Sequence, residues 1–261
     1  MQNRVEATLI TGAERRDLAG CTVMLHKMLP ANSWNFVVDV DCEPADLERN
    51  VRRVEKEFHE ARRSPAWITG PYDRPADLGQ RLTALGYVHE SDRTIMFVDA
   101  PPKLGETAPD GLEIEAADEV TVDECVAIAV QRLGWPHEWA KSLRKAALAG
   151  IERGPDHYRM FHASLHGAGV ATAFIVYSGA TAGLYGMATS REFEGKGIGR
   201  AVLGHCAAAA FERGIDLMTL QVSTGSKAEK FYEKAGFKSA YVARRLVKKG
   251  GTAKGRSAEE E

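Results

Sequence analysis

The chain has 261 residues, of which 44% are hydrophobic and 27% charged, and its formal net charge at pH 7 is −2. This balance gives no electrostatic reason for nucleic-acid binding, and without a run of about 18 apolar residues we expect no membrane-spanning segment. Charge interrupts the N-terminal sequence too early for a signal peptide.

The four cysteines favour a reducing, cytoplasmic environment. They lie far apart and form no CxxC pair, which argues against a disulfide framework and a zinc site, so we expect no bound metal. Cys206 falls on the apolar face of a predicted helix, together with Ile198 and Val202, and is predicted to be a core residue and not a nucleophile.

The first half of the chain is predicted to alternate strands and helices. Strands are expected over residues 33–40, 66–70 and 93–100. Apolar residues recur at spacings of three or four, which predicts an amphipathic helix, at Leu47, Val51, Val54 and Phe58. A second helix is predicted over 77–86, with Gly86 as its C-cap.

The second half follows a stretch rich in Pro and Gly at 99–111, which is interpreted as an interdomain linker. Strands are predicted over 112–117, 157–165, 169–179, 181–190, 217–223 and 237–248, and helices over about 120–132, 137–149, from about 199, and over 226–236. This layout predicts an α/β (α+β) fold with a mixed, mostly antiparallel sheet flanked by helices. Residues 250–261 have almost no apolar content and are predicted to be a disordered tail.

A glycine-rich stretch, EFEGKGIGRAV at 192–202, lies between a predicted strand and a predicted helix. Backbone amides at a helix N terminus, the helix dipole and close approach through glycine together favour a pyrophosphate site, whereas a structural turn is the alternative. Lys196 and Arg200 add cationic side chains. Neither GxGxxG nor the Walker A spacing fits this stretch, which argues against both nucleotide motifs.

Residues 112–248 resemble the GNAT superfamily of acyl-CoA N-acyltransferases. The resemblance is carried by the Q/R-x-x-G-x-G/A loop, matched at 194–199, and by a YxxxGF helix end, matched from Tyr232 to Phe237. It implies acetyl-CoA as the acyl donor, with the pyrophosphate bound by the backbone of Gly195, Lys196, Gly197, Ile198, Gly199 and Arg200. It also implies that the pantetheine arm lies along the strand at Met187, Ala188 and Thr189, like an added strand.

Two positions depart from the family pattern. Glu194 stands where the family has Gln or Arg, and we expect an anion there to weaken binding of the pyrophosphate. Gly225 stands where the family often has Asn, which leaves one cofactor contact unassigned.

The resemblance also suggests the catalytic groups. Tyr232 would protonate the departing CoA thiolate, because a phenol stays protonated at neutral pH; packing of its ring in the core is the alternative role. The amide of Met187 would hold the oxyanion. No general base is evident, and the candidates are Glu192, Glu194, Asp156, His157 and His162, or water.

Residues 1–105 resemble a degenerate copy of the same fold, through RPADLGQRLTALGYV at 74–88. Leu82 replaces the tyrosine, and no glycine loop precedes a helix in this half, so it is expected to bind no cofactor and to shape the acceptor site or support the fold. The predicted organisation is therefore a degenerate GNAT-like domain at 1–105, a GNAT domain at 106–249 and the tail at 250–261.

The leading hypothesis is an acetyl-CoA-dependent N-acetyltransferase for a primary amine of a small molecule or peptide, monomeric or homodimeric. A non-catalytic acyl-CoA-binding or sensing module is the alternative, and a partner-binding protein without cofactor is a third. The acceptor itself carries no diagnostic motif. Trp135 and Trp139 could line an aromatic pocket for it or pack in the core.

Overall fold

A computed structural model of the chain describes residues 2–18, 20–102, 104 and 108–248. The predicted tail at 250–261 and part of the predicted linker lie outside the described residues. The first half contains α1 (Gln2–Ile10), β1 (Ala13–Leu18), β2 (Cys21–His26), β3 (Phe36–Val38), α2 (Leu47–Glu60), β4 (Ala66–Thr69), α3 (Leu78–Ala84) and β5 (Tyr87–Val98).

The second half begins with a strand and two helices that precede a three-stranded meander. Its elements are β6 (Leu112–Ala116), α4 (Val122–Arg132), the 3-10 turn η1 (His137–Trp139), α5 (Ala140–Glu152), β7 (Tyr158–Leu165), β8 (Ala168–Ser178), β9 (Thr181–Thr189), the 3-10 turn η2 (Arg191–Phe193), α6 (Ile198–Phe211), β10 (Leu217–Ser223), α7 (Lys227–Lys234) and β11 (Lys238–Lys248).

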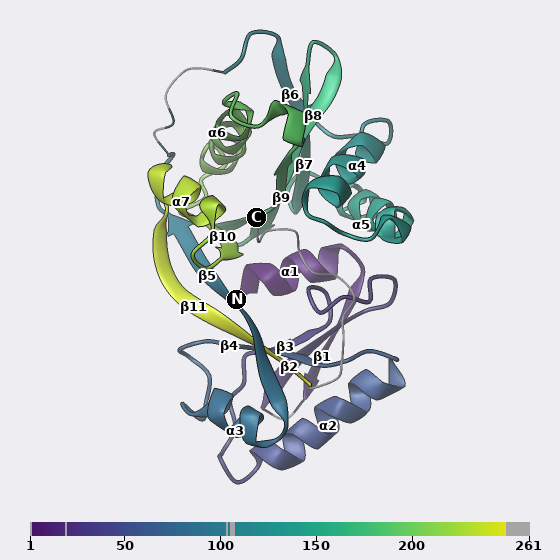
Figure 1. Ribbon diagram of the computed structural model, residues 1–261, viewed down its shortest axis with the longest axis vertical. Coiled ribbons are helices and arrows are strands. Elements are labelled where there is room, and N and C mark those ends of the chain that lie inside the picture. Colours follow the sequence, from purple (N-terminus) through teal and green to yellow (C-terminus); the bar gives the residue numbers. More distant parts are fainter. Residues whose placement is uncertain (1, 19, 103, 105–107, 249–261) are drawn as a thin grey trace.

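One eleven-stranded sheet runs through both halves, in the order β1-β2-β3-β4-β11-β5-β10-β9-β8-β7-β6. Its strand pairs are antiparallel except β3 with β4 and β9 with β10, which are parallel. Figure 1 shows the helices on both sides of this sheet. The predicted fold class, a mostly antiparallel mixed sheet flanked by helices, is confirmed.

The same pattern occurs at both ends of the sheet. In each half a parallel strand pair is joined by a crossover helix, as β3-α2-β4 and as β9-α6-β10, and a short helix and a long strand follow. The two long strands are exchanged: β11 lies between β4 and β5, and β5 lies between β10 and β11. Each half therefore completes the sheet of the other. The division into domains at 1–105 and 106–249 stays a prediction.

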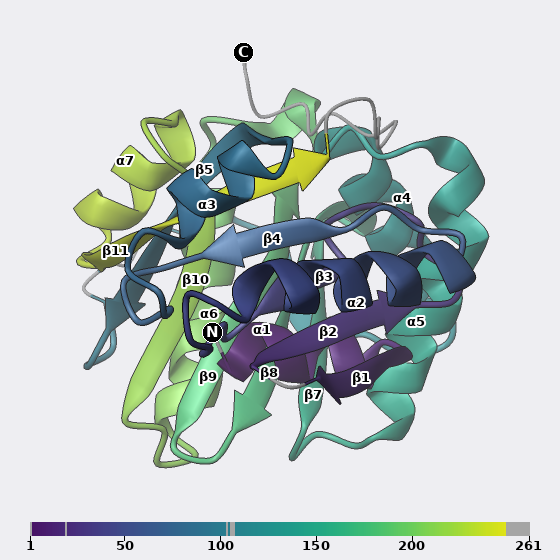
Figure 2. The ribbon, with the colours of Figure 1, turned by 90° about the horizontal axis from the view of Figure 1, so that it is seen from below.

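The predicted helix over 47–58 forms as α2, and its four apolar positions are all buried. They pack with α3 against one face of the first half of the sheet (Figure 2). In the second half, α6 and α7 cover one face, where Cys206 is fully buried, as predicted for a core residue. The helices α4 and α5 cover the other face.

Helix α1 joins the two halves. It lies between them in Figure 1, with Ala7 and Ile10 in the core beneath α4 and α5, and Val5 in the core on the strands of the first half. Helix α1 and strands β1 and β2 were not predicted from sequence. For α1 and β1 the residues show why: α1 alternates small apolar and polar side chains, and the edge strand β1 reads AERRDL, which shows no apolar alternation.

Two predicted strand boundaries were wrong. The strand expected at 33–40 is only Phe36–Val38, because Trp34 leaves the sheet to pack with other tryptophans. The strand expected at 93–100 begins at Tyr87. Its polar first residues pair with β11. Because this partner is distant in the sequence, the local pattern could not indicate the pairing.

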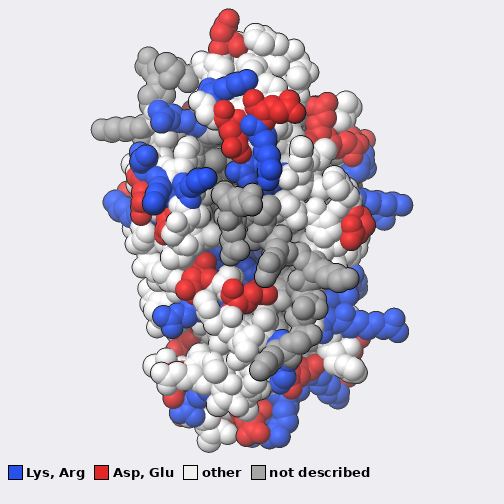
Figure 3. Space-filling view, in the orientation of Figure 1, with Lys and Arg blue, Asp and Glu red and all other residues white. Residues whose placement is uncertain are grey.

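The surface carries charges of both signs. On the face seen in Figure 3, Lys and Arg are interspersed with Asp and Glu over both halves. Among the described helices, none is long and apolar enough to cross a bilayer.

The exchange of β11 can be tested by mutation. Leu246 lies on β11 but packs in the core of the first half and is 4% exposed. We expect Leu246→Ala to lower the free energy of unfolding by about 2–4 kcal/mol, because it leaves a cavity. Hydrogen exchange should show the loss as faster exchange in α2 and β4.

Val242→Ala is the matched control, since Val242 lies on the same strand and is 42% exposed. Its effect in urea denaturation should stay within about 0.5 kcal/mol. A loss of the same small size for Leu246→Ala would contradict the packing of β11 into the first half.

Candidate active site

The glycine stretch forms the N terminus of α6. Gly195 has φ +76° and Gly197, the N-cap, has φ +83°, a left-handed backbone that side chains disfavour. Lys196 places its ammonium 4.8 Å from the centre of the Phe193 ring. The turn itself therefore explains two of the three alternating glycines.

No side chain caps this helix. Glycine at the N-cap cannot offer an oxygen to the first amides of α6, which have no partner within the helix. In α7, by contrast, Ser226 Oγ accepts a hydrogen bond from the Glu229 amide at 3.1 Å. The start of α6 is thus open to an anion, unlike the start of α7. Helices α2, α3, α4 and α5 also lack a side-chain cap, and α6 differs from them in its glycine N-cap with a left-handed backbone.

Gly199, unlike Gly195 and Gly197, does not need to be glycine for backbone reasons. It lies within the first turn of α6 with ordinary φ, and a Cβ built on it would meet Thr189 Oγ1 at 3.5 Å, an ordinary contact. The fold does not require glycine at this position. Close approach of a ligand to the helix backbone would explain why glycine stands at this position.

The strands β9 and β10 diverge next to this helix. Over the described residues they pair only from Thr181 to Gly183 on β9 and from Leu217 to Thr219 on β10. Beyond these pairs, β9 continues along β8 as far as Thr189 and β10 continues along β5 as far as Ser223. The two facing edges thus leave an opening in the sheet, which we call the slot.

A β-bulge bends β9 where the slot opens. Its register against β8 shifts between the pairs Phe174–Tyr185 and Thr172–Ala188, so that Gly186 and Met187 together oppose one residue. Gly186 has φ +58°, and a Cβ there would lie 2.8 Å from the Phe174 ring. Glycine is required at this position, and the bulge strengthens the local bend.

The structure brings Met187 and Tyr232 together. The Tyr232 hydroxyl donates to Met187 Sδ across 3.8 Å, and the Tyr232 ring packs edge-on against Phe231 and Phe237. Tyr232 therefore packs in the core, as the alternative interpretation held, while its hydroxyl points toward β9. Ala188 is buried, and Thr189 lies beside Gly199, so the end of β9 adjoins the start of α6.

The remaining loop residues lie at the start of α6. Ile198 is buried at 1% exposure, and Arg200 Nη1 donates to the Leu104 carbonyl at 3.4 Å.

Glu194, the unexpected anion, is held by an arginine from another element. Arg132 Nε, at the end of α4, lies 2.7 Å from Glu194 Oε1. The pair is partly exposed. The sequence analysis missed Arg132, and no spacing could have indicated it, because the two residues are 62 positions apart and belong to different motifs. The charge of Glu194 beside the loop is thus offset by a guanidinium.

Three of the base candidates are engaged elsewhere. Asp156 accepts from Arg213 Nη2 at 2.5 Å, and this hydrogen bond lowers the pKa of the carboxyl. His162 Nε2 lies 2.8 Å from Glu124 Oε2. With Glu194 paired to Arg132, only Glu192 and His157 remain from the predicted set, and no described contact connects them with the slot.

On the face of the sheet that α4 and α5 cover, side chains from both halves of the chain pack together. Trp34 packs edge-on against Trp135 and Trp139, with ring centres 5.3 Å and 6.0 Å away. Trp139 is buried, so core packing is its main role. The first half thus contributes to the structure around α4 and α5.

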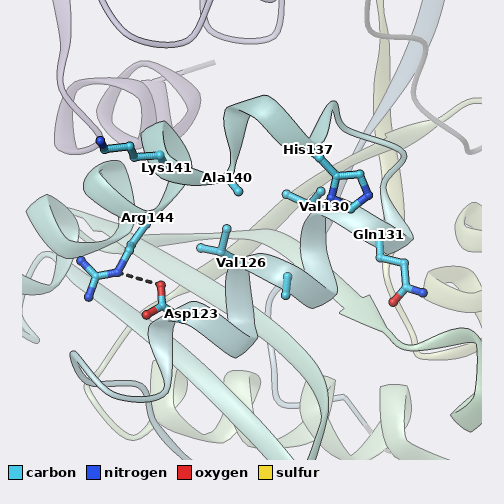
Figure 4. A pocket seen from close by; sticks show the side chains of 9 residues that line it. Asp123, Val126, Val130, Gln131, His137, Ala140, Lys141 and Arg144 are labelled. Atoms are coloured by element: carbon cyan, nitrogen blue, oxygen red, sulfur yellow. Dashed lines mark hydrogen bonds and ion pairs between the residues drawn. The ribbon is translucent and has the colours of Figure 1, made fainter.

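A pocket of about 470 Å³ lies between α4 and α5 (Figure 4). Val126 and Val130 are the buried members of its lining, and the ion pair between Asp123 and Arg144, at 2.7 Å, bridges the two helices at one side. The pocket lies in the same part of the chain as Trp135 and Trp139, which were considered for an acceptor pocket from the sequence.

Comparison with known proteins points to one family and one fold. Residues 126–237 match the model of the acetyltransferase (GNAT) family. A comparison with curated proteins finds no match. Among solved structures, a GCN5-related N-acetyltransferase from Kribbella flavida has a TM-score of 0.77 at 17% identity, over 96% of this chain and 94% of that one.

Two further structures have the same fold. A GCN5-related N-acetyltransferase from Sphaerobacter thermophilus has a TM-score of 0.65 at 17% identity, over 88% of this chain and 80% of that one. A tandem GNAT protein from the clavulanic acid biosynthesis pathway has a TM-score of 0.61 at 16% identity, over 89% and 79%. Residues 126–237 therefore match the GNAT family, the chain has a GNAT-like fold, and the predicted resemblance is confirmed.

Gly199→Ala tests whether a ligand approaches α6. Because a Cβ fits at this position in the protein itself, we expect unchanged or slightly raised stability, by up to about 1 kcal/mol from helix propensity. Binding of acetyl-CoA should weaken at least about tenfold by calorimetry, which corresponds to about 1.4 kcal/mol.

Gly204→Ala, on the same helix, is the control, since its Cβ would also meet only an ordinary contact, at 3.4 Å. It should leave the affinity unchanged. Equal affinities for all three proteins would contradict a cofactor site at the start of α6.

A double-mutant cycle tests the role of Arg132. Arg132→Ala would leave the charge of Glu194 without its partner, and we expect the Kd for acetyl-CoA to rise roughly fivefold at low salt, since exposed ion pairs are worth about 1 kcal/mol or less. In the Arg132→Ala/Glu194→Gln double variant, part of the affinity should return. No recovery would mean that Glu194 does not act on the ligand.

Proposed function

We propose that this protein is an acetyl-CoA-dependent N-acetyltransferase that acts on a primary amine of a small molecule or peptide. One observation carries the proposal: the slot between β9 and β10 opens beside the uncapped N terminus of α6. The GNAT match and fold support acyl transfer in general. The donor, the reaction and the acceptor class are the proposed part.

The proposed cofactor contacts use the backbone. Amides from Gly195 to Arg200 would bind the pyrophosphate, and the open edge of β9 at Met187, Ala188 and Thr189 would bind the pantetheine arm. A buried amide needs a hydrogen-bond partner, and a strand edge that has left its neighbour offers several such groups to a ligand. The third glycine at Gly199, which the fold does not require, supports the same assignment.

The proposed chemistry follows from the slot. The neutral amine attacks the thioester carbonyl carbon, the Met187 amide donates to the oxyanion, and the carbon–sulfur bond then breaks. Tyr232 gives its proton to the thiolate. Its hydroxyl already points at a sulfur atom, that of Met187 at 3.8 Å, and a thiolate is a stronger acceptor than a thioether. The nitrogen, which carries a positive charge after the attack, loses its proton to water, and Tyr232 regains a proton from water.

The first half is proposed to be a GNAT-like copy without a cofactor site. The segment between β3 and α2 stands where the glycine loop stands in the second half, and it carries the carboxylates Asp39, Asp41, Glu43 and Asp46. Asp41 and Asp46 pair with Arg74 and Arg49, whereas the charges of Asp39 and Glu43 would repel a pyrophosphate. Leu82, at the position of the tyrosine, is fully buried. We propose that this half serves the acceptor side through α1 and Trp34.

The direct experiment is a calorimetric titration of acetyl-CoA into the full chain, followed by turnover with a panel of amines. We expect one site per chain with micromolar affinity, and release of free CoA with some amines. Binding at two sites would contradict the proposed role of the first half. Binding without any turnover would favour an acyl-CoA-binding module, and no binding would contradict the cofactor site itself.

Tyr232→Phe separates proton donation from packing. The ring and its contacts with Phe231 and Phe237 are kept, so stability and acetyl-CoA affinity should change little. We expect kcat to fall by about 100-fold or more, the usual size for loss of a general acid.

Tyr177→Phe is the control, because Tyr177 is a buried tyrosine of the same core whose hydroxyl has no hydrogen-bond partner among the described residues. Its kcat should match that of the wild type. An equal, unchanged kcat for Tyr232→Phe would reduce Tyr232 to a packing role.

A further inference from the structure

An arginine from α1 reaches the open part of β10. Arg4 Nη1 donates to Gln221 Oε1 at 2.8 Å, and Arg4 Nη2 donates to the Ser33 carbonyl at 3.4 Å. The guanidinium also lies 4.5 Å from the centre of the Phe36 ring. These three partners are neutral, and the side chain is half-buried.

Two more arginines share the face of the sheet that α1 covers. In the register of β10, β5 and β11, Gln221 lies opposite Ile95, Arg93 opposite Ala243, and Arg245 opposite Ser91. Because side chains alternate along a strand, Gln221, Arg93 and Arg245 point to one side, that of Ile95 and Ala243, which pack with Val5 of α1.

The guanidinium groups of Arg93 and Arg245 lie close enough to act on that of Arg4. Burial, together with the nearby Arg245 and Arg93, lowers the pKa of Arg4 to about 9, whereas Tyr185 raises it. Glu90 faces the cluster, with its Oε2 3.3 Å from Arg245 Nη1. Three arginine side chains, that of Arg4 included, are thus gathered together, and one of them, Arg245, is paired with Glu90.

Arg4 also lies beside the slot. Gln221 belongs to the part of β10 beyond Thr219, where pairing with β9 has ended, and Tyr185 belongs to the open part of β9. The face is the one opposite α6 and α7, the helices beside the proposed cofactor site. An acceptor that meets the thioester from this side passes Arg4.

We propose that Arg4, with Arg93 and Arg245 behind it, binds a carboxylate of the acceptor, so that the substrate is an amine that also bears a carboxylate. This inference rests on the proposed acetyltransferase function. A guanidinium held by neutral carbonyl oxygens keeps further N–H donors in a planar fork, and that fork matches a carboxylate. The carboxylate would bind at α1 while the amine reaches the slot, which couples the first half of the chain to substrate choice.

The test compares pairs of acceptors that differ in one group. Full-length protein is assayed for release of free CoA with amino acids and with their primary carboxamides. We expect kcat/KM to favour the carboxylate by about 100-fold, which is the size expected for hydrogen bonds to a charged group. Arg4→Gln should remove this preference mostly through KM, leave turnover of the carboxamides within about threefold, and keep the acetyl-CoA affinity.

Arg15→Gln is the control for loss of a positive charge, since Arg15 lies on the surface and pairs with Asp17. It should retain the preference. Equal turnover of carboxylates and carboxamides by the wild type overturns this inference and leaves the proposed function intact. This comparison does not depend on whether Arg4→Gln folds. A preference for a phosphorylated amine over both would assign the arginines to a phosphate instead. Failure of every amine, with or without acetyl-CoA binding, contradicts the proposed function itself.

Discussion

The separation of β9 from β10 is the constraint on which the rest of the site depends. Two parallel strands in the middle of a sheet ordinarily pair along their length, because buried amides and carbonyls without partners destabilise the fold. Here they part after three residue pairs, and a bulge at Gly186 turns β9 away. The proposed site is built around this break: the end of β9 leads to α6, and the hydroxyl of Tyr232 points at its edge.

The two sides of the break are served by different parts of the chain. On one side, α6 and α7 come from the sequence that directly follows β9 and β10, so the glycine loop and Tyr232 reach the slot by short local connections. On the other side, α1 comes from the far end of the chain and lies across the strands of both halves. This arrangement allows the surroundings of the proposed acceptor site to vary without disturbing the glycine loop.

Much of the second half could be predicted from sequence, because its signals are local. The periodicity of α6, the alternation in β7 to β9 and the glycine loop depend on neighbours within a few residues. The pair Arg132–Glu194 and the contact between Arg4 and Gln221 could not be predicted, since their partners are 62 and 217 positions apart. The open edge of β9 could be expected only from the family resemblance, because a bulge and a missing strand pair leave no periodic pattern in the sequence. Polar segments such as β1 and the start of β5 were missed for the same reason: their partners lie in distant strands.

Because β5 and β11 are exchanged, strand pairing holds the two halves together even without the backbone connection between them. A protease cut between β5 and β6 would leave each fragment with one long strand laid between two strands of the other. The fragments should then migrate together under native conditions and part only in denaturant. Expressed alone, either fragment would expose the strand edges that the exchange normally covers, and such edges are prone to aggregate. Each half therefore depends on a long strand from the other, and we expect the two halves to unfold together.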